Sequence, residues 1–230
     1  MMSMNRLYKL IHLAILKSVW VNFYCLPFKQ AIKFPILLAR GVRISYIHRG
    51  AIQFANNQDV KRGGVRIGFQ DLEWSYDKKS VLNIKGRLII KGNGYHSFSP
   101  GLSLAIASGA VMEIGNNFSC SHNTRFTIFK SLVIGDNNMW SFDNLIMDTD
   151  AHYIFNEKGE MISHNAGITF GDHVWLGCRN VILKGATIPD GSIIGAGGVV
   201  TKSLAKKNSV YVGNQLLREG IDWNMTLNYD

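Results

Sequence analysis

The sequence predicts an all-β fold: a parallel β-helix whose coils are built from six-residue repeats. In the segment 170–205 an apolar residue recurs at every sixth position, and a mostly small residue recurs four places after it. The apolar positions are Phe170, Leu176, Ile182, Ile188, Ile194 and Val200. The small positions are Val174, Asn180, Ala186, Ser192, Gly198 and Leu204. A period of six is neither helical nor a two-residue alternation, and it is typical of β-helices in which about three hexads make one coil.

Each position of the repeat has a physical reason. The apolar residue that opens a hexad fills the narrow interior of the coil, and the small residue leaves room beside it. Gly171, Gly177 and Gly195 stand at second positions, where glycine permits the backbone angles of tight corners. A single coil cannot bury a core of its own, so stacked coils must share one continuous core.

The repeat is weaker towards the N-terminus. Short apolar or alternating runs punctuated by glycines between 41 and 110 indicate the first, irregular coils of the same solenoid. Regular hexads begin at 112–117 and return at 133–138. Residues 70–80 interrupt the pattern with Trp74, Tyr76 and two lysines. This loop either stacks on a sugar or covers the end of the solenoid.

The composition divides the chain into three parts. We expect a basic helical segment at 1–40, the β-helix domain at 41–207 with an extruded loop at 153–167, and a C-terminal tail at 208–230. The chain has 25 basic and 16 acidic residues, a net charge of +9. Nearly all of this excess lies in the first 50 residues, which have eight basic residues and no acidic one. An anionic partner is therefore expected.

The N-terminal segment predicts an amphipathic helix over residues 4–19. Its apolar stripe runs through Leu7, Ile11, Ile15 and Val19, with Leu13 and Leu16 off the stripe. The segment is too short and too charged to span a bilayer, and Lys17 interrupts the apolar run that a signal peptide needs. Two interpretations remain: the helix packs on the β-helix or on a neighbouring subunit, or it lies on an anionic membrane surface.

His152 marks the candidate functional position. The six-residue series Ile134, Trp140, Ile146 continues to His152, where an aliphatic residue is expected, and residues 153–167 then leave the repeat entirely. A break of this kind in a regular scaffold is a typical place for function. An imidazole can act as a general base near neutral pH. The alternative is a structural loop histidine.

Four short motifs carry a resemblance to a known family. They are Asp-Ala-His at 150–152, Val-Trp-Leu-Gly at 174–177, Ile-Leu-Lys-Gly at 182–185 and the glycine-rich run at 194–202. The chain resembles the left-handed β-helix acyltransferases, especially the O-acetyltransferases of capsule and surface-polysaccharide gene clusters, strongly over about 112–213. The resemblance implies a left-handed coil, acetyl-CoA as donor, and a homotrimer with active sites between subunits.

The resemblance also implies roles for particular residues. His152 would deprotonate the acceptor hydroxyl for direct attack on the thioester. Independently of the resemblance, Asp148 and Asp150 are close enough in sequence to orient the imidazole ring through its other nitrogen; the alternative is that Asp150 caps the loop. Trp175, at an outward position, would lie beside the coenzyme or acceptor; the alternative is a subunit interface. The implied coenzyme contacts are Gly177, Gly195, Ala196, Gly197, Thr201 and Lys202. Alternatively, the glycines merely turn corners. The tail lacks the family's usual lysine, and whether Arg218 replaces it is open.

Other chemistries are disfavoured. Three cysteines without CxxC spacing indicate a reducing compartment, with neither a disulfide framework nor a zinc knuckle. His164 and His173 do not have the spacing of a three-histidine zinc site, so no metal is expected. The chain has no nucleotide-binding loop. Its basic residues lie in an apolar segment without a recognisable nucleic-acid module, so no nucleic-acid partner is expected.

The sequence thus predicts an enzyme that moves an acetyl group from acetyl-CoA to a sugar hydroxyl of a bacterial capsule, surface polysaccharide or precursor. Two alternatives are N-acetylation of an amino sugar and a non-catalytic β-helix scaffold at the membrane. We expect a cytoplasmic protein, either free or peripheral at the inner face of the membrane through residues 1–40.

Overall fold

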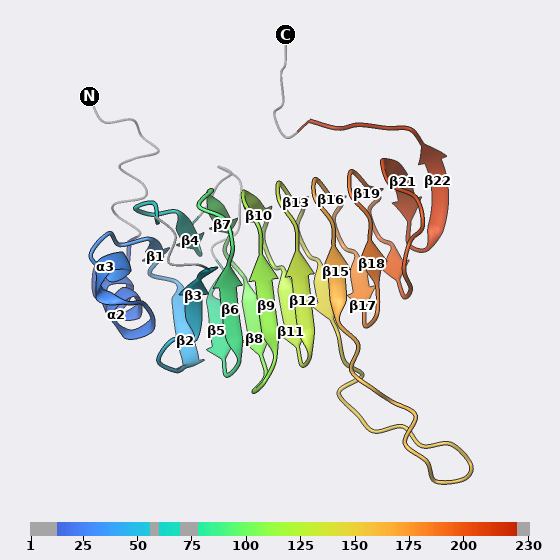
Figure 1. Cartoon of the computed structure of the whole chain (residues 1–230), viewed down its shortest axis with the longest axis horizontal. Coiled ribbons are helices and arrows are strands. Elements are labelled where there is room, and N and C mark those ends of the chain that lie inside the picture. The colour runs from blue at the N-terminus through green and yellow to red at the C-terminus, as the bar shows by residue number, and fades with distance from the viewer. Residues whose placement is uncertain (1–12, 56–59, 70–77, 225–230) are drawn as a thin grey trace.

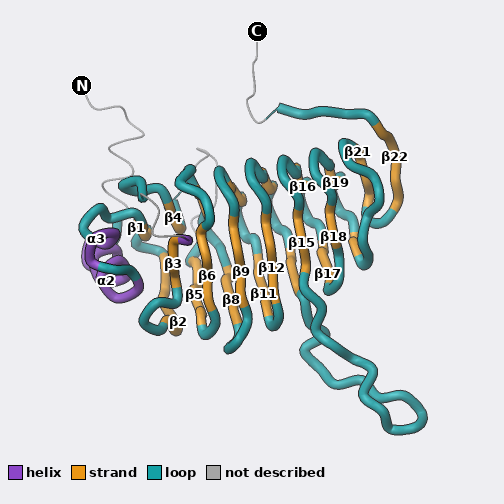
Figure 2. Tube along the Cα trace, in the orientation of Figure 1, coloured by secondary structure: helices purple, strands orange, loops and turns teal. Residues whose placement is uncertain are grey.

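The computed structural model describes residues 13–55, 60–69 and 78–224. It is a left-handed parallel β-helix, elongated along the axis on which the coils stack (Figures 1 and 2). Three sheets form its faces, and each coil contributes one strand to each face in turn. The predicted fold class is confirmed.

The strands of the three faces are as follows. The first face contains β1 (Ile36–Leu38), β4 (Val65–Ile67), β7 (His96–Phe98), β10 (Phe118–Cys120), β13 (Met139–Trp140), β16 (Trp175–Leu176), β19 (Ile193–Ile194), β21 (Ser209–Val212) and β22 (Gln215–Glu219). The second face contains β2 (Val42–Ile47), β5 (Ser80–Ile84), β8 (Ser103–Ile106), β11 (Arg125–Ile128), β14 (Leu145–Met147), β17 (Val181–Leu183) and β20 (Val199–Val200). The third face contains β3 (Ile52–Phe54), β6 (Arg87–Ile90), β9 (Val111–Ile114), β12 (Ser131–Ile134), β15 (Ile168–Phe170) and β18 (Thr187–Ile188).

Coil length explains where the six-residue period is visible. Asn180 and Gly198, which hydrogen-bond between neighbouring coils, are 18 residues apart, so each face there receives one hexad. Asn123 and Asp143 are 20 residues apart, and the extra residues at the corners blur the period. Asn144 and Asn180 are 36 residues apart because this coil carries the inserted loop between β14 and β15 (Figure 1).

The core lies along the inside of the three faces. All six apolar positions and all six small positions predicted for the interior are buried. In the middle coils the core is aromatic: Trp140 contacts Phe118, Phe126 and Phe170, with ring centroids between 4.4 and 5.8 Å apart. Large aromatic rings therefore fill the interior where the coils are longer than 18 residues.

Corner residues adopt left-handed backbone angles. Asn117, Asn137 and His173 have φ of 51°, 56° and 57°, and they occupy one edge of the prism in successive coils. Asparagine tolerates this conformation better than most side chains. The Asn117 amide also donates to Asn137 Oδ1 at 3.0 Å. At this edge, asparagines adopt the left-handed backbone conformation that glycines adopt at other corners.

The N-terminal helix differs from the predicted one. α2 (Ile15–Cys25) buries Ser18, Val21, Asn22 and Cys25, whereas the predicted stripe residues Ile15 and Val19 are exposed. Leu7 and Ile11 lie outside the described residues. The buried face of the helix is partly polar because of the strand that it packs against. α2 lies against β1, the open edge of the first coil, and an open edge needs hydrogen-bonding groups.

Ser18 and Asn22 supply those groups. Ser18 Oγ accepts from Leu38 N at 2.9 Å, and Asn22 Oδ1 accepts from Ile36 N at 3.1 Å. Asn22 Nδ2 donates to the Ile36 carbonyl at 2.7 Å. A short helix, α3 (Phe28–Ala31), follows, with Pro27 as its N-cap. Among the described residues, no helix is long and apolar enough to cross a membrane.

The described strands reach beyond residues 41–207. β1 precedes that range and pairs with β4, and β21 follows it and pairs with β19. β22 folds back antiparallel on β21 and ends the first face. The tail beyond β22 returns along the molecule (Figure 1), and Trp223 packs on His173 with ring centroids 4.2 Å apart.

Candidate active site

The loop that carries His152 leaves the β-helix at the edge between the second and third faces. It connects β14 to β15 and projects from the coil (Figure 1). A pocket of about 330 Å³ lies at its base. The pocket is lined by Phe129, Thr149, Asp150, Ala151, His152, Tyr153, Met161, Ser163, His164 and Asn165. His152 is exposed and does not fill an interior position of the repeat.

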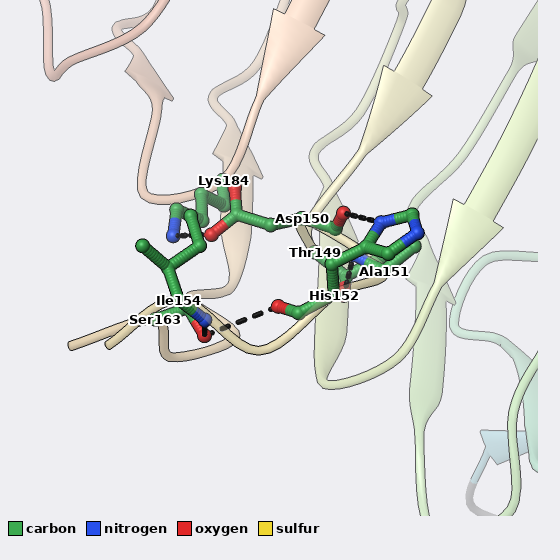
Figure 3. A network of polar contacts seen from close by, with 7 residues as sticks. All are labelled: Thr149, Asp150, Ala151, His152, Ile154, Ser163 and Lys184. Carbon is green, nitrogen blue, oxygen red and sulfur yellow. Dashed lines mark hydrogen bonds and ion pairs between the residues drawn. The ribbon is translucent and has the colours of Figure 1, made fainter. Parts of the chain in front are cut away.

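The backbone assigns the tautomer of His152. Its Nδ1 lies 3.2 Å from the Asp150 carbonyl oxygen (Figure 3). A carbonyl can only accept, so this contact requires that Nδ1 carry the proton. In the neutral imidazole the lone pair is then on Nε2, which is the arrangement that a general base needs.

The carboxylates of Asp148 and Asp150 contact groups other than the imidazole ring, which agrees with the alternative in which Asp150 holds the loop. Asp150 Oδ2 forms an ion pair with Lys184 Nζ (Figure 3). Asp148 is fully buried, and its carboxylate accepts from the backbone amides of Phe129, Lys130 and Ser131 at 2.7–2.8 Å. Asp148 therefore caps the turn that precedes β12, and Asp150 fixes the loop to the next coil.

The base of the loop is held by local hydrogen bonds. Thr149 Oγ1 accepts from Ala151 N at 3.0 Å, and Ser163 Oγ donates to the His152 carbonyl at 3.1 Å (Figure 3). Ala151 has φ of 59°, a left-handed conformation that strains a residue other than glycine. A strained residue directly before the candidate base is held in place by these contacts.

Thr201 and Lys202 follow β20 on the same edge as His152. They are exposed, and the β17–β20 pairing, in which Ile182 faces Val200, sets them one coil beyond Lys184. The side chain of Asn214 forms two hydrogen bonds with Thr201. Its Oδ1 accepts from Thr201 N at 3.0 Å, and its Nδ2 donates to Thr201 Oγ1 at 2.7 Å. The structure thus brings two of the predicted coenzyme contacts to the edge that carries the candidate base.

The remaining predicted coenzyme contacts lie on a different edge, between the first and second faces. Gly177, Gly195, Ala196 and Gly197 follow β16 and β19 there. A Cβ on Gly177 would stand 2.8 Å from the Ile194 carbonyl oxygen, so coil stacking alone demands this glycine. Gly197 has φ of 73° and open space around it, which leaves its backbone accessible.

Trp175 lies on the first face, in β16, and its side chain points outward with 37% exposure. It does not line the pocket at His152. Its ring centroid is 6.0 Å from that of Trp223. Within one chain the predicted residues therefore divide among two edges and one face.

Two further contacts were not predicted from the sequence. The Lys184–Asp150 ion pair connects the His152 loop to the next coil; the only signal for it was that both residues belong to the motifs shared with the family. His173 stacks on Trp223, whose Nε1 donates to the His173 carbonyl at 2.9 Å. Trp223 is fifty positions from His173 in the sequence, so no local sequence pattern could predict that they contact each other.

Possible metal ligands and thiols within residues 13–55, 60–69 and 78–224 lie as follows. No group of three or more His, Cys, Asp or Glu side chains there could hold a metal ion. The three cysteines are free thiols. Burial raises the pKa of Cys25 to about 11, against the weaker effect of backbone hydrogen bonds from Ile52 and Ala51, so this thiol stays protonated and unreactive.

Relatives in sequence are acetyltransferases. The galactoside O-acetyltransferase of Escherichia coli is 37% identical over 99 residues, 42% of this chain and 47% of that protein. The polysialic acid O-acetyltransferase of Neisseria meningitidis is 31% identical over 111 residues, 44% of this chain and 51% of that protein. The chain thus spans about half the length of the curated relatives it matches. No protein-family profile matches it.

Solved structures of similar shape include two polysialic acid acetyltransferases. NeuO has a TM-score of 0.48 at 20% identity and covers 85% of this chain and 92% of its own. OatWY has a TM-score of 0.45 at 20% identity and covers 82% and 90%. These values are too low to support a statement about activity, so the relation rests on the sequence. In sequence this chain is similar to hexapeptide-repeat acetyltransferases, as its motifs predicted.

Proposed function

We propose that this protein is an acyltransferase that moves an acyl group from a coenzyme A thioester to a sugar. The observation that carries the proposal is the imidazole of His152, which lines a pocket and has Nδ1 directed at a backbone carbonyl. A neutral histidine in this tautomer has a basic Nε2 that can accept a proton from a hydroxyl group.

The chemistry needs one proton carrier. Nε2 of His152 takes the proton of the acceptor hydroxyl as its oxygen forms a bond to the thioester carbonyl carbon. The tetrahedral intermediate then collapses, the carbon–sulfur bond breaks, and the same nitrogen returns the proton to the thiolate. The thioester is already activated, so no acyl-enzyme is needed.

The finer proposal is transfer of acetyl from acetyl-CoA to a hydroxyl of a bacterial capsule or surface polysaccharide, or of its precursor. Its support is the motif resemblance together with relatives named as galactoside and polysialic acid O-acetyltransferases. Thr201 and Lys202, on the edge that carries His152, are the candidates to meet the phosphates of the coenzyme.

We further propose a homotrimer in which the site lies between subunits. Trp175 and the glycine edge are separated from His152 within one chain. A neighbouring copy that faces the His152 edge with its first face would bring the two sets together. The same arrangement would cover an outward tryptophan.

The test is coenzyme A release from acetyl-CoA, followed with a thiol reagent over a panel of sugars, amino sugars and capsular oligosaccharides. We expect acceptor-dependent release that falls about 10²–10⁴-fold in His152→Ala. The control is His164→Ala, an exposed histidine of the same pocket, which should retain activity within about tenfold. Release that survives His152→Ala unchanged, or no release with any acceptor, would contradict the proposal.

A further inference from the structure

Among the residues that the structure describes, the outward face of the N-terminal helices is apolar and exposed. Exposed side chains form a terminal apolar face, with exposures between 36% and 85%. It comprises Ile15, Leu16, Val19, Trp20, Phe23, Tyr24, Phe28 and Ile32. Trp20 stacks on Tyr24 with ring centroids 4.8 Å apart, and Phe23 contacts Phe28 at 6.1 Å. Concentrated apolar exposure of this kind marks an interaction surface.

The core of the β-helix does not need this face. α2 attaches to β1 through Ser18, Asn22 and the buried Val21. The aromatic residues Trp20, Phe23 and Tyr24 are not among the residues that α2 buries. The helix itself lies at the end of the molecule, beside the first coil (Figure 1). These aromatic residues are therefore available to a partner outside the β-helix.

A basic groove adjoins the terminal apolar face. It has a volume of about 540 Å³ and is lined by Trp20, four basic residues, and Gly41, Val42 and Ile44. The four basic residues are Lys17, Arg40, Arg43 and Lys79. Lys17 Nζ already donates to the Val42 carbonyl at 2.8 Å, whereas Arg40 and Arg43 are exposed arginines. The first 50 residues contain no acidic side chain to neutralise them.

An anionic phospholipid surface is the partner that suits both features: its interface takes up aromatic and aliphatic side chains, and its headgroups attract arginines and lysines. Tryptophan and tyrosine belong at the level of the headgroups, and guanidinium groups bind phosphates. An acidic glycan would use the charges and leave the apolar face bare. A second copy placed on this face by a two-fold axis would bring the same positive charges together.

We propose that this end of the β-helix docks on an anionic phospholipid bilayer, with the terminal apolar face in the interface and lipid phosphates in the basic groove. The proposal is independent of the transferase activity. It places a membrane at the N-terminal end of the β-helix, while the His152 pocket opens at an edge between two faces several coils further along.

The test is flotation of the full chain with vesicles of phosphatidylcholine containing about 30% phosphatidylglycerol, against phosphatidylcholine alone. We expect binding only with the anionic lipid, weakened at least about tenfold in Leu16→Ser/Phe28→Ser and in Arg40→Glu/Arg43→Glu. The matched controls are Leu217→Ser and Lys158→Glu/Arg218→Glu, at exposed positions distant from α2, which should bind like the unmodified protein.

Several results would overturn the proposal. These are no vesicle binding by the unmodified chain, equal binding to both lipids, or equal weakening in the test and control variants. Binding of dextran sulfate without vesicle binding would instead assign the groove to an acidic glycan. A smaller particle mass for Leu16→Ser/Phe28→Ser by light scattering would assign the face to a second copy. Thiol release with soluble acceptors should be unchanged in Leu16→Ser/Phe28→Ser and in Arg40→Glu/Arg43→Glu, which separates this test from that of the transferase.

Discussion

Asp150 shows how one residue can act through its backbone as well as its side chain. Its carbonyl oxygen faces His152 Nδ1 and its carboxylate faces Lys184. Because every residue type has the carbonyl, we expect Asp150→Asn to keep its coenzyme A release rate within about tenfold of wild type. The loss of a half-exposed ion pair should lower stability by only about 0.2–1 kcal/mol. A loss of activity near that of His152→Ala would mean that the carboxylate itself serves the ring.

Gly197 can decide between the two roles left open for the corner glycines. Its φ of 73° strains any other residue, and so does the φ of 79° at Gly109; a Cβ added at either position would meet nothing within 4 Å. Alanine at either position should therefore cost about 1 kcal/mol of stability. We expect only Gly197→Ala to weaken coenzyme A binding in a calorimetric titration, because Gly109 is in an early coil between β8 and β9. Equal affinity in both variants would leave Gly197 as a corner residue alone.

His96 makes the fold sensitive to acid. Burial lowers its pKa to about 4 from 6.5, only partly opposed by the Gly92 backbone and the Asp136 charge. The unfolded chain takes up a proton on this residue below about pH 6.5, whereas the folded chain does not. Folding stability is therefore complete above pH 6.5 and is lost as the pH falls towards 4. The loss at pH 5 should be about 2 kcal/mol relative to pH 7.5.

The substitution His96→Leu should remove this acid-dependent loss of folding stability. We expect the fall in Tm between pH 7.5 and pH 5 to be about 4–8 °C smaller in His96→Leu than in wild type. Differential scanning calorimetry at the two pH values measures it, with the exposed His164→Leu as control. An unchanged pH dependence in His96→Leu would show that His96 is not the acid-sensitive group.

The element α2 is stabilised by its polar face, where an amphipathic helix would use an apolar one. Asn22→Leu should leave the buried N–H and C=O of Ile36 without their partners. Each unsatisfied group costs about 1–3 kcal/mol, so Tm should fall by roughly 5–10 °C. Asn165→Leu, at an exposed asparagine, is the control and should change Tm little. A thermal scan with both variants equal to wild type would contradict the edge-capping role.

This helix also shows where sequence patterns stop being informative. The six-residue period identified the core from Phe170 to Val200 because each of those side chains repeats one environment, coil after coil. α2 occurs once and covers a strand edge, so its inward residues are donors and acceptors. A search for an apolar stripe therefore selected Ile15 and Val19, which are exposed.

The site was predictable in the same uneven way. His152 was identified because it breaks a repeat, and the loop that follows confirms the break. The sequence carries no distinction between the carbonyl and the carboxylate of Asp150, and only the three-dimensional structure separates them. The distance between Trp175 and the His152 pocket depends on which face each strand joins, and residue spacing alone does not determine that.

At the scale of the whole molecule, the separation of Trp175 from the His152 pocket makes the proposed homotrimer testable. If His152 of one subunit and Trp175 of the next form each site, mixed trimers of two impaired variants should regain activity. With equal amounts of His152→Ala and Trp175→Ala, random assembly leaves both residues intact at about a quarter of the sites.

We therefore expect the co-expressed pair to reach about a quarter of the wild-type rate of coenzyme A release, well above the mean of the two variants measured separately. The control mixes His152→Ala with the double variant His152→Ala/Trp175→Ala, in which no subunit provides the histidine and no recovery is possible. Sites contained in one chain would give only the mean of the separate rates. Since Trp175 and His152 lie on different parts of one chain, recovery would locate the reacting groups between neighbouring subunits.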